Sequence, residues 1–354
     1  MRHTRTFSNR LLRGTALLLC LLMILPLAAC GETRKTQREI YSMDTIMTLT
    51  AYGNDAEKGL NAAESVILAM DAMLDPELET STVYAVNHAK GQSVVVSAQI
   101  AKMLTCAKTV YDRSGGALDL SLYPLIKRWG FVDQKYYKPT DLEIAEDLGR
   151  LCFDRITLTS FPASGTYSLT IPDYGMLSFG AVAKGCAAEN AVDAMRQAGV
   201  KSGIVSLGGN VQTLGLKPDG SRWKVAIQDP ENPEGYVGVI SVGETAVVTS
   251  GPYQRNFTIK GVQYHHILNP ATGHPSGSSL RSVTILCEDG TLADCLSTAM
   301  FVLGETKALN YWRQYGGFEM ILITTDDRIV CTKGLLEDFT LSPDSSKYSV
   351  IYSE

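Results

Sequence analysis

Residues 201–250 decide the fold, and they read KSGIVSLGGNVQTLGLKPDGSRWKVAIQDPENPEGYVGVISVGETAVVTS. Strand-like apolar stretches follow one another here, separated by turns such as Pro218-Asp219-Gly220; they cover residues 203–206, 224–228, 237–242 and 246–250. Consecutive strands joined by turns pair antiparallel, whereas parallel neighbours need a long crossover between them. This stretch therefore predicts a largely antiparallel sheet.

Helical patterns lie on both sides of this stretch. Apolar residues recur at helical spacing in residues 55–74, 98–113, 120–128, 181–198, 292–303 and 306–315. Further strands are expected at residues 46–52, 155–159, 167–171, 257–259, 283–287, 320–324 and 328–332. Neither an internal repeat nor a Pro-rich linker divides the chain. We therefore expect one α+β domain over residues 40–354, with a mixed, largely antiparallel sheet and packed helices.

The composition narrows the class of protein. Of 354 residues, 45% are hydrophobic and 19% are charged, which excludes a disordered chain. The net charge is -5, and it would be still more negative without the four arginines in the first 13 residues. Because nucleic-acid binding needs a basic face, we expect no nucleic-acid partner.

The first thirty residues are typical of an export signal. An Arg-rich start precedes an apolar run from Thr15 to Ala29, which Pro26 interrupts. This run is too short to cross a bilayer, which needs roughly 20 apolar residues. Leu27-Ala28-Ala29-Cys30 resembles a bacterial lipobox. We expect a signal peptide over residues 1–29, a lipid on Cys30, a tether over residues 30–39, and a protein held at the extracytoplasmic face of the cell membrane.

Six cysteines remain after Cys20 and Cys30 are set aside, and they include no CxxC pair. A zinc ribbon or a thioredoxin-type site is therefore not expected. Several of the six lie in helical apolar patterns, where a free cysteine behaves as a small core residue. We expect mostly reduced, buried thiols.

Common catalytic motifs are absent: the sequence has no GxGxxG, no P-loop, no HExxH and no GxSxG. Polar residues gather instead at Gly-rich junctions between the expected helices and strands, which we call joints. Gly116-Ala117-Leu118-Asp119 precedes Trp129, and Asp119 on its own is expected as a helix cap. Residues 178–185, SFGAVAKG, lead from a strand into a helix, where Lys184 and free amide groups suit a phosphate; close packing of glycines explains the same stretch equally well.

Two further joints carry possible chemistry. His265 and His266 end a strand, so only one of them points into a given site, and Asn269-Pro270-Ala271-Thr272-Gly273 is a turn sequence. Asp294 and Thr298 stand four residues apart and share a helix face. Their oxygens suit Mg²⁺, although an acid early in a helix also fits a purely structural role.

Together and in this order, these joints resemble the ApbE family of FAD:protein FMN transferases. The marks that match lie between Met43 and Ala299: Met43-x-Thr45, Ser81, Asn87, Gly116 to Asp119, Pro124, Trp129-Gly130-Phe131, Gly180 to Gly185, Ser206-Leu207-Gly208-Gly209-Asn210, Thr249-Ser250-Gly251, His266-Ile267, Pro270, Thr272-Gly273, Ala293-Asp294 and Thr298-Ala299. The resemblance implies a T-fold-like α+β architecture. It also implies a Mg²⁺-dependent enzyme that transfers FMN from FAD to a Thr or Ser hydroxyl of a target protein and releases AMP.

The resemblance also implies roles for particular residues. The side chains of Asp294 and Thr298 and the backbone oxygen of Ala181 would hold Mg²⁺, and His266 would be the catalytic base. The FAD site would be lined by Met43, Ala117, Leu118, Asp119, Ser178, Lys184 and Ile267. The acceptors would carry FMN-binding domains in membrane or extracytoplasmic redox complexes. The sequence departs from the family at Ser178, Pro252 and Asn269, where Asp is common.

These residue types suit the transfer of a phosphoryl-linked group to a hydroxyl. An unactivated hydroxyl needs a base within hydrogen-bond reach, and histidine, with an ordinary pKa near 6.5, suits that task. Two other functions remain open from the sequence. One is an FAD pyrophosphatase that uses water and yields FMN and AMP, and the other is a non-catalytic flavin-binding lipoprotein.

Overall fold

The computed structural model describes residues 34–354, so the signal peptide and Cys30 lie outside the described part. The helices are α2 (Ala56–Leu74), α3 (Thr82–Asn87), α4 (Ala98–Ser114), α5 (Tyr123–Arg128), α6 (Asp141–Leu148), α7 (Ala183–Gln197) and α8 (Gly290–Tyr315). The strands are β1 (Lys35–Ser42), β2 (Thr45–Tyr52), β3 (Val94–Val96), β4 (Thr157–Phe161), β5 (Thr166–Thr170), β6 (Ser202–Leu207), β7 (Asn210–Leu214), β8 (Trp223–Asp229), β9 (Asn232–Val242), β10 (Ala246–Ser250), β11 (Asn256–Ile259), β12 (Val262–His265), β13 (Leu280–Cys287), β14 (Glu319–Thr324), β15 (Arg328–Thr332), β16 (Phe339–Leu341) and β17 (Ser349–Ser353).

A nine-stranded sheet in the order β1-β2-β6-β7-β10-β13-β14-β15-β17 forms the centre of the molecule. Each neighbouring pair is antiparallel except β15 with β17, which are parallel. The expected α+β fold with a largely antiparallel sheet is therefore confirmed.

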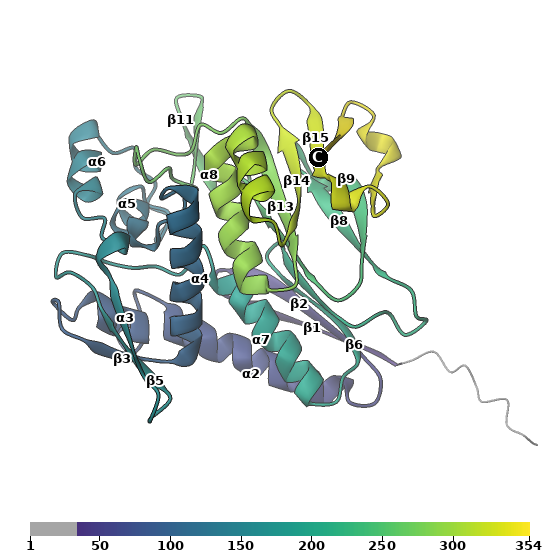
Figure 1. Ribbon diagram of the computed structural model, residues 1–354, viewed down its shortest axis with the longest axis horizontal. Helices are drawn as coiled ribbons and strands as arrows, with labels where there is room; N and C mark the ends of the chain where they lie inside the picture. Colours follow the sequence, from purple (N-terminus) through teal and green to yellow (C-terminus); the bar gives the residue numbers. More distant parts are fainter. Residues whose placement is uncertain (1–33) are drawn as a thin grey trace, which may run out of the picture.

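The two faces of this sheet are covered differently. Helices α2, α7 and α8 pack on one face and α4 packs against α8 (Figure 1); the largest apolar core extends through these helices and the sheet. The three-stranded sheet β16-β9-β8 covers part of the other face and encloses a second core around Trp223 and Ile321. A third, smaller core joins α5, α6 and the β11-β12 hairpin around the fully buried Trp129. The chain thus forms three layers, with the helices on the side that carries the candidate site.

Several local expectations need correction. The tether was expected to extend to residue 39, but β1 begins at Lys35 and pairs along its whole length with β2. The helix expected over residues 120–128 is a 3-10 turn at Leu120–Leu122 followed by α5, because Pro124 fits only the first turn of an α-helix. The helix expected from residue 181 begins at Ala183, so Ala181 precedes it.

The two expected helices at residues 292–303 and 306–315 are continuous in α8 except for a kink at Gly304. The φ and ψ angles of this residue are 75° and 169°, a conformation open essentially to glycine alone. All six cysteines of the described part are free, and five of them are buried, as expected. Among residues 34–354, no helix is both long enough and apolar enough to cross a bilayer.

Candidate active site

The helices α7 and α8 meet at two glycines beside Asp294. A Cβ atom on Gly185 would lie 2.1 Å from the Gly290 carbonyl oxygen and 2.6 Å from the Asp294 Cβ, so only glycine permits this approach. The Gly185 amide then donates a hydrogen bond of 2.8 Å to Asp294 Oδ2. Asp294 is 3% exposed, and this contact fixes its carboxylate at the start of α7.

Three hydroxyl groups form a cluster on α8 and the end of β10, in the part of α8 that begins with Asp294. Ser250 Oγ is 2.8 Å from Ser297 Oγ and 3.4 Å from Thr298 Oγ1. Ser297 also donates a hydrogen bond to the Asp294 carbonyl oxygen. The structure therefore places Thr298 one helical turn from Asp294 with a serine as neighbour. Sequence reasoning gave Ser250 no role, although Thr249-Ser250-Gly251 was among the matching marks.

The segment before α7 carries the other expected site residues. Ser178 donates its amide to the Leu120 carbonyl oxygen at 3.0 Å, which joins this segment to the Ala117–Asp119 stretch. The Val182 and Ala183 amides both bind the Phe179 carbonyl oxygen. Among the described residues, no hydrogen bond uses the Ala181 carbonyl oxygen, because the Gly185 amide turns to Asp294 instead. This oxygen is therefore available to a ligand.

Asp119 caps the 3-10 turn, as its structural interpretation predicts. Its Oδ1 accepts hydrogen bonds from the Ser121 amide at 2.7 Å and the Ser121 hydroxyl at 2.6 Å. Burial raises the pKa of Asp119, and these two hydrogen bonds oppose the rise. Capping occupies one carboxylate oxygen and leaves Oδ2 without such a bond, so the cap and a ligand contact are compatible. Ala117 and Leu118 are both buried beside it.

The turn between β1 and β2 consists of Met43 and Asp44, whose φ angles are both positive at 48° and 59°. The Met43 amide and the Ser42 hydroxyl both donate to Asp71 Oδ2, at 3.1 and 2.7 Å. Arg255 pairs with Asp44 at 3.3 Å. This ion pair links the turn to the segment that also holds His266.

His266 is anchored by its neighbour strand. Its amide donates to the Arg255 carbonyl oxygen at 3.1 Å, and its Nδ1 lies 3.2 Å from the same oxygen. Since a carbonyl oxygen only accepts, Nδ1 carries the proton and Nε2 keeps a free electron pair. Burial lowers the pKa of His266 to about 3, the hydrogen bond to Arg255 opposes this, and the positive charge of Lys184 adds to the lowering. The pKa of His266 therefore lies well below the ordinary histidine value near 6.5.

The neighbouring residues of the His266 joint have structural contacts. His265 Nε2 lies 3.2 Å from the Ser276 carbonyl oxygen, so the two histidines have different partners. Ile267 is buried, and its carbonyl oxygen accepts from the Ser276 amide. Asn269 Oδ1 accepts from the Ala271 amide at 2.9 Å, which builds the turn. Asn269, which stands where Asp is common in the family, thus retains the side-chain oxygen that the turn needs.

These contacts connect most of the expected residues. Asp294 touches the residue after Lys184, Lys184 is close enough to influence His266, and Ser178 is bonded to Leu120. The turn at Met43 joins through Asp44 and Arg255. Within residues 34–354 there is no group of three or more His, Cys, Asp or Glu side chains that could hold a metal. A cation at Asp294 would therefore need neutral oxygens beside this one carboxylate.

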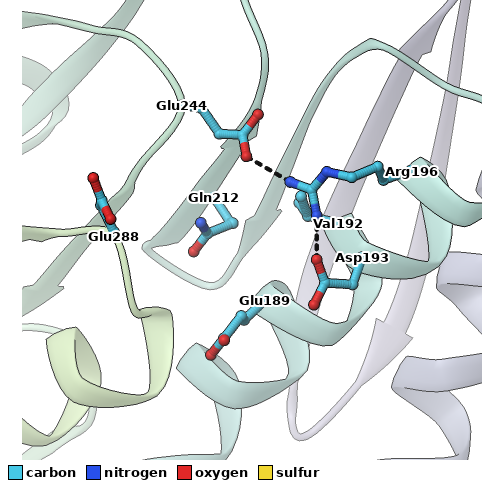
Figure 2. Close-up of a pocket in the computed structure, with 7 residues that line it drawn as sticks. All are labelled: Glu189, Val192, Asp193, Arg196, Gln212, Glu244 and Glu288. Atoms are coloured by element: carbon cyan, nitrogen blue, oxygen red, sulfur yellow. Dashed lines mark hydrogen bonds and ion pairs between the residues drawn. The ribbon is translucent and has the colours of Figure 1, made fainter.

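A cavity of about 400 Å³ lies elsewhere, between α7, β7 and the start of α8 (Figure 2). None of the expected site residues lines it; its walls are Glu189, Val192, Asp193, Arg196, Gln212, Glu244 and Glu288. Arg196 bridges Asp193 and Glu244, and Glu189 pairs with Lys102 at 2.6 Å. Three of its four carboxylates therefore already have a basic partner, although two of them share Arg196. A second cavity of about 340 Å³ at the β2-α2 junction also contains none of the expected residues.

Comparison with known proteins settles the family. Residues 43–322 match the ApbE family. The chain belongs to the ApbE family. Two ApbE-type relatives named FAD:protein FMN transferase come from Treponema pallidum and Klebsiella pneumoniae. The first is 30% identical over 328 residues, covering 87% of this chain and 91% of the relative. The second is 29% identical over 324 residues, covering 89% and 98%.

Solved ApbE structures share the fold. The ApbE protein of Thermotoga maritima superimposes with a TM-score of 0.76 at 23% identity, covering 89% of this chain and 99% of its own. The flavin transferase ApbE of Vibrio cholerae gives 0.72 at 22% identity, covering 90% and 100%. The expected ApbE membership and architecture are both confirmed.

Proposed function

We propose that this protein is an FAD:protein FMN transferase, an enzyme that moves the FMN part of FAD to a Thr or Ser hydroxyl of a target protein and releases AMP. Its ApbE relatives carry this name and align with most of the chain. The observation that carries the proposal is the Gly185 contact to Asp294, which joins the two helices that bear the expected metal and phosphate residues.

The transfer exchanges the phosphoanhydride bond of FAD for a phosphoester bond on the acceptor. The acceptor hydroxyl oxygen attacks the phosphorus of the FMN half, the bond from this phosphorus to the bridging oxygen breaks, and AMP leaves with that oxygen. The hydroxyl proton must pass to a base. His266 can take it at Nε2, because the hydrogen bond to Arg255 holds the proton on Nδ1. The positive charge of Lys184, which also acts on His266, would stabilise the negative charge of the phosphates.

The oxygens of this site fit Mg²⁺. Asp294 has one carboxylate oxygen free of the Gly185 contact, and the Ala181 carbonyl is without a hydrogen bond among the described residues. Thr298 adds a hydroxyl on the same helix face. We propose that these three groups hold Mg²⁺, which prefers oxygen ligands and retains waters or substrate phosphates. When bound, the ion supplies positive charge to the diphosphate oxygens.

The remaining expected residues form the proposed FAD site. Met43 stands at the β1-β2 turn, Ile267 follows the proposed base, and Ser178 is bonded to the stretch that ends in Leu120. A hydroxyl at Ser178 replaces the Asp common in the family. Since Ser178 Oγ already accepts from the Gly180 amide at 3.3 Å, we propose that it shapes the loop as well as contacting the flavin nucleotide.

The site of action is also proposed. The lipobox at Cys30 supports a lipid-anchored protein at the extracytoplasmic face of the membrane. Its acceptors would be proteins with FMN-binding domains in membrane or extracytoplasmic redox complexes. Because β1 begins at Lys35, only four residues would separate Cys30 from the folded body.

The proposal is tested with the mature protein, FAD, Mg²⁺ and an acceptor that contains an FMN-binding domain. We expect flavin fluorescence that stays with the acceptor after denaturation, and an increase in acceptor mass by one FMN on a Thr or Ser. Chelation of Mg²⁺ should stop the reaction. AMP release at the same rate without acceptor, with no labelled protein, would identify an FAD pyrophosphatase instead.

A further inference from the structure

The loop between β5 and α7 has no regular structure, yet it carries Ser178 and Ala181. A loop of this kind lacks the ladder of hydrogen bonds that fixes a strand. Its backbone is held at one point by a single distant side chain. Asn87 Oδ1 accepts from the Leu177 amide at 2.7 Å, and Asn87 Nδ2 donates to the Leu177 carbonyl oxygen at 2.9 Å.

This pair of bonds depends on the chemistry of asparagine. A carboxamide offers an acceptor and a donor side by side, so it matches the two backbone groups of one residue as a neighbouring strand would. Aspartate lacks the donor and leucine lacks both groups. Asn87 ends α3, whose Val83 and Val86 are buried in the main core. The amide is therefore presented from an anchored helix.

The Asn87–Leu177 contact is the first in a series of hydrogen bonds that leads along the chain to the proposed metal site. Leu177 precedes Ser178, whose amide binds Leu120. The Phe179 carbonyl oxygen then accepts the amides that start α7. Two residues into that helix, Gly185 binds Asp294. A shift at Leu177 would therefore move the backbone on which Ser178 and Ala181 stand.

We propose that Asn87 is a positioning residue of the flavin site, which sets the path of the loop so that Ser178 and Ala181 face FAD. This inference rests on the proposed function. Asn87 acts through Leu177 and takes no part in the transfer itself. The competing explanation is that its two hydrogen bonds only stabilise the fold.

The variant Asn87→Ala separates these explanations when it is compared with Ser81→Ala. Ser81 caps the same helix by accepting from the Tyr84 amide at 2.9 Å, and among the described residues it makes no hydrogen bond to Leu177. Both substitutions should lower the melting temperature, because each removes a hydrogen bond made by an end of α3. Only Asn87→Ala should weaken FAD binding, by about tenfold, because it loses two hydrogen bonds that order the loop.

Three measurements complete the test. FAD affinity is followed by flavin fluorescence with and without Mg²⁺, and steady-state kinetics gives the KM for FAD and for the acceptor. Hydrogen exchange reports on the Leu177 amide. We expect Asn87→Ala to raise the KM for FAD, to leave the KM for the acceptor unchanged and to speed exchange at Leu177. A smaller folded fraction alone would lower kcat and leave both KM values unchanged.

The outcomes that would overturn the inference are specific. Unchanged FAD affinity in Asn87→Ala, despite faster exchange at Leu177, would reduce Asn87 to a stabilising residue. Equal weakening of FAD binding in Ser81→Ala would lead to the same conclusion. Failure of the unaltered protein to bind FAD would instead overturn the proposed function, and the exchange data would still show whether Asn87 orders the loop.

Discussion

Replacing Gly185 by alanine should separate α7 from α8 beside Asp294. The new Cβ would stand 2.1 Å from the Gly290 carbonyl oxygen, and real contacts of this kind stay above 3.0 Å, so the helices must part by about 1 Å. Overpacking of this kind costs about 1–3 kcal/mol. Losing the hydrogen bond from the Gly185 amide to the carboxylate adds about 1.5–3 kcal/mol. We expect the free energy of unfolding to fall by about 2.5–6 kcal/mol.

The same displacement should affect activity, because a shift of about 1 Å in a catalytic group can lower the rate about 100-fold. Urea unfolding followed by circular dichroism gives the stability, and FMN transfer to the acceptor gives the rate. Gly180→Ala is the matched control for stability, since its Cβ would meet only Ser178 Oγ at an ordinary 3.6 Å. Its free energy of unfolding should change by less than about 0.5 kcal/mol.

The reasoning would be refuted if Gly185→Ala unfolded at the same urea concentration as the unaltered protein. It would also be refuted if both alanine variants lost stability equally, because the effect would then come from the glycines themselves rather than from the helix contact.

Three further variants or conditions test other parts of the site. Asp294→Asn keeps an acceptor for the Gly185 amide but removes the negative charge, so the protein should stay folded. The rate of FMN transfer should fall at least about 100-fold at a fixed Mg²⁺ concentration. Full activity of this variant would exclude Asp294 as a metal ligand. Because burial lowers the pKa of His266 to about 3, kcat/KM should stay level from about pH 8 to pH 5, whereas a fall centred near pH 6.5 would contradict a neutral His266 in the free enzyme. In the unfolded chain the His266 side chain takes up a proton near pH 6.5, whereas in the folded chain it stays neutral. The stabilising contribution of His266 to the free energy of unfolding should therefore decrease as the pH falls below 6.5, which urea titrations at several pH values would measure. Trp129→Phe removes the hydrogen bond of 3.0 Å to the Gly273 carbonyl oxygen and part of a buried ring, and should cost about 2–4 kcal/mol of stability in the same assay.

The antiparallel character could be predicted where strands follow one another through a turn, as β14 and β15 do in the nine-stranded sheet and β8 and β9 do in the smaller one. Most other neighbours in the nine-stranded sheet are not consecutive in the chain. Strand β7 was missed, since Gly208 and Gly209 interrupt the apolar pattern just before it. Helix α6 was also missed, although Thr140 and Glu143 form a capping box that the spacing alone could have revealed. The parallel pairing of β15 with β17 depends on the path of the chain between them and has no local signal.

The candidate site was predictable in part. Helical spacing placed Asp294 and Thr298 on one face, and the remaining roles came from the order of the motifs. Local patterns could not reveal that Asn87 binds Leu177, because 90 positions separate them. Nor could they give the environment of His266, whose pKa depends on burial by segments from several parts of the chain.

The kink at Gly304 divides α8 into a first half that bears Asp294 and Thr298 and a second half in which Tyr311 and Trp312 are buried. A break of this kind interrupts the regular backbone of the helix, so the two halves are less rigidly coupled than the ends of a straight helix. We therefore expect a substitution in the second half to disturb Asp294 and Thr298 less than a substitution of equal size in the first half.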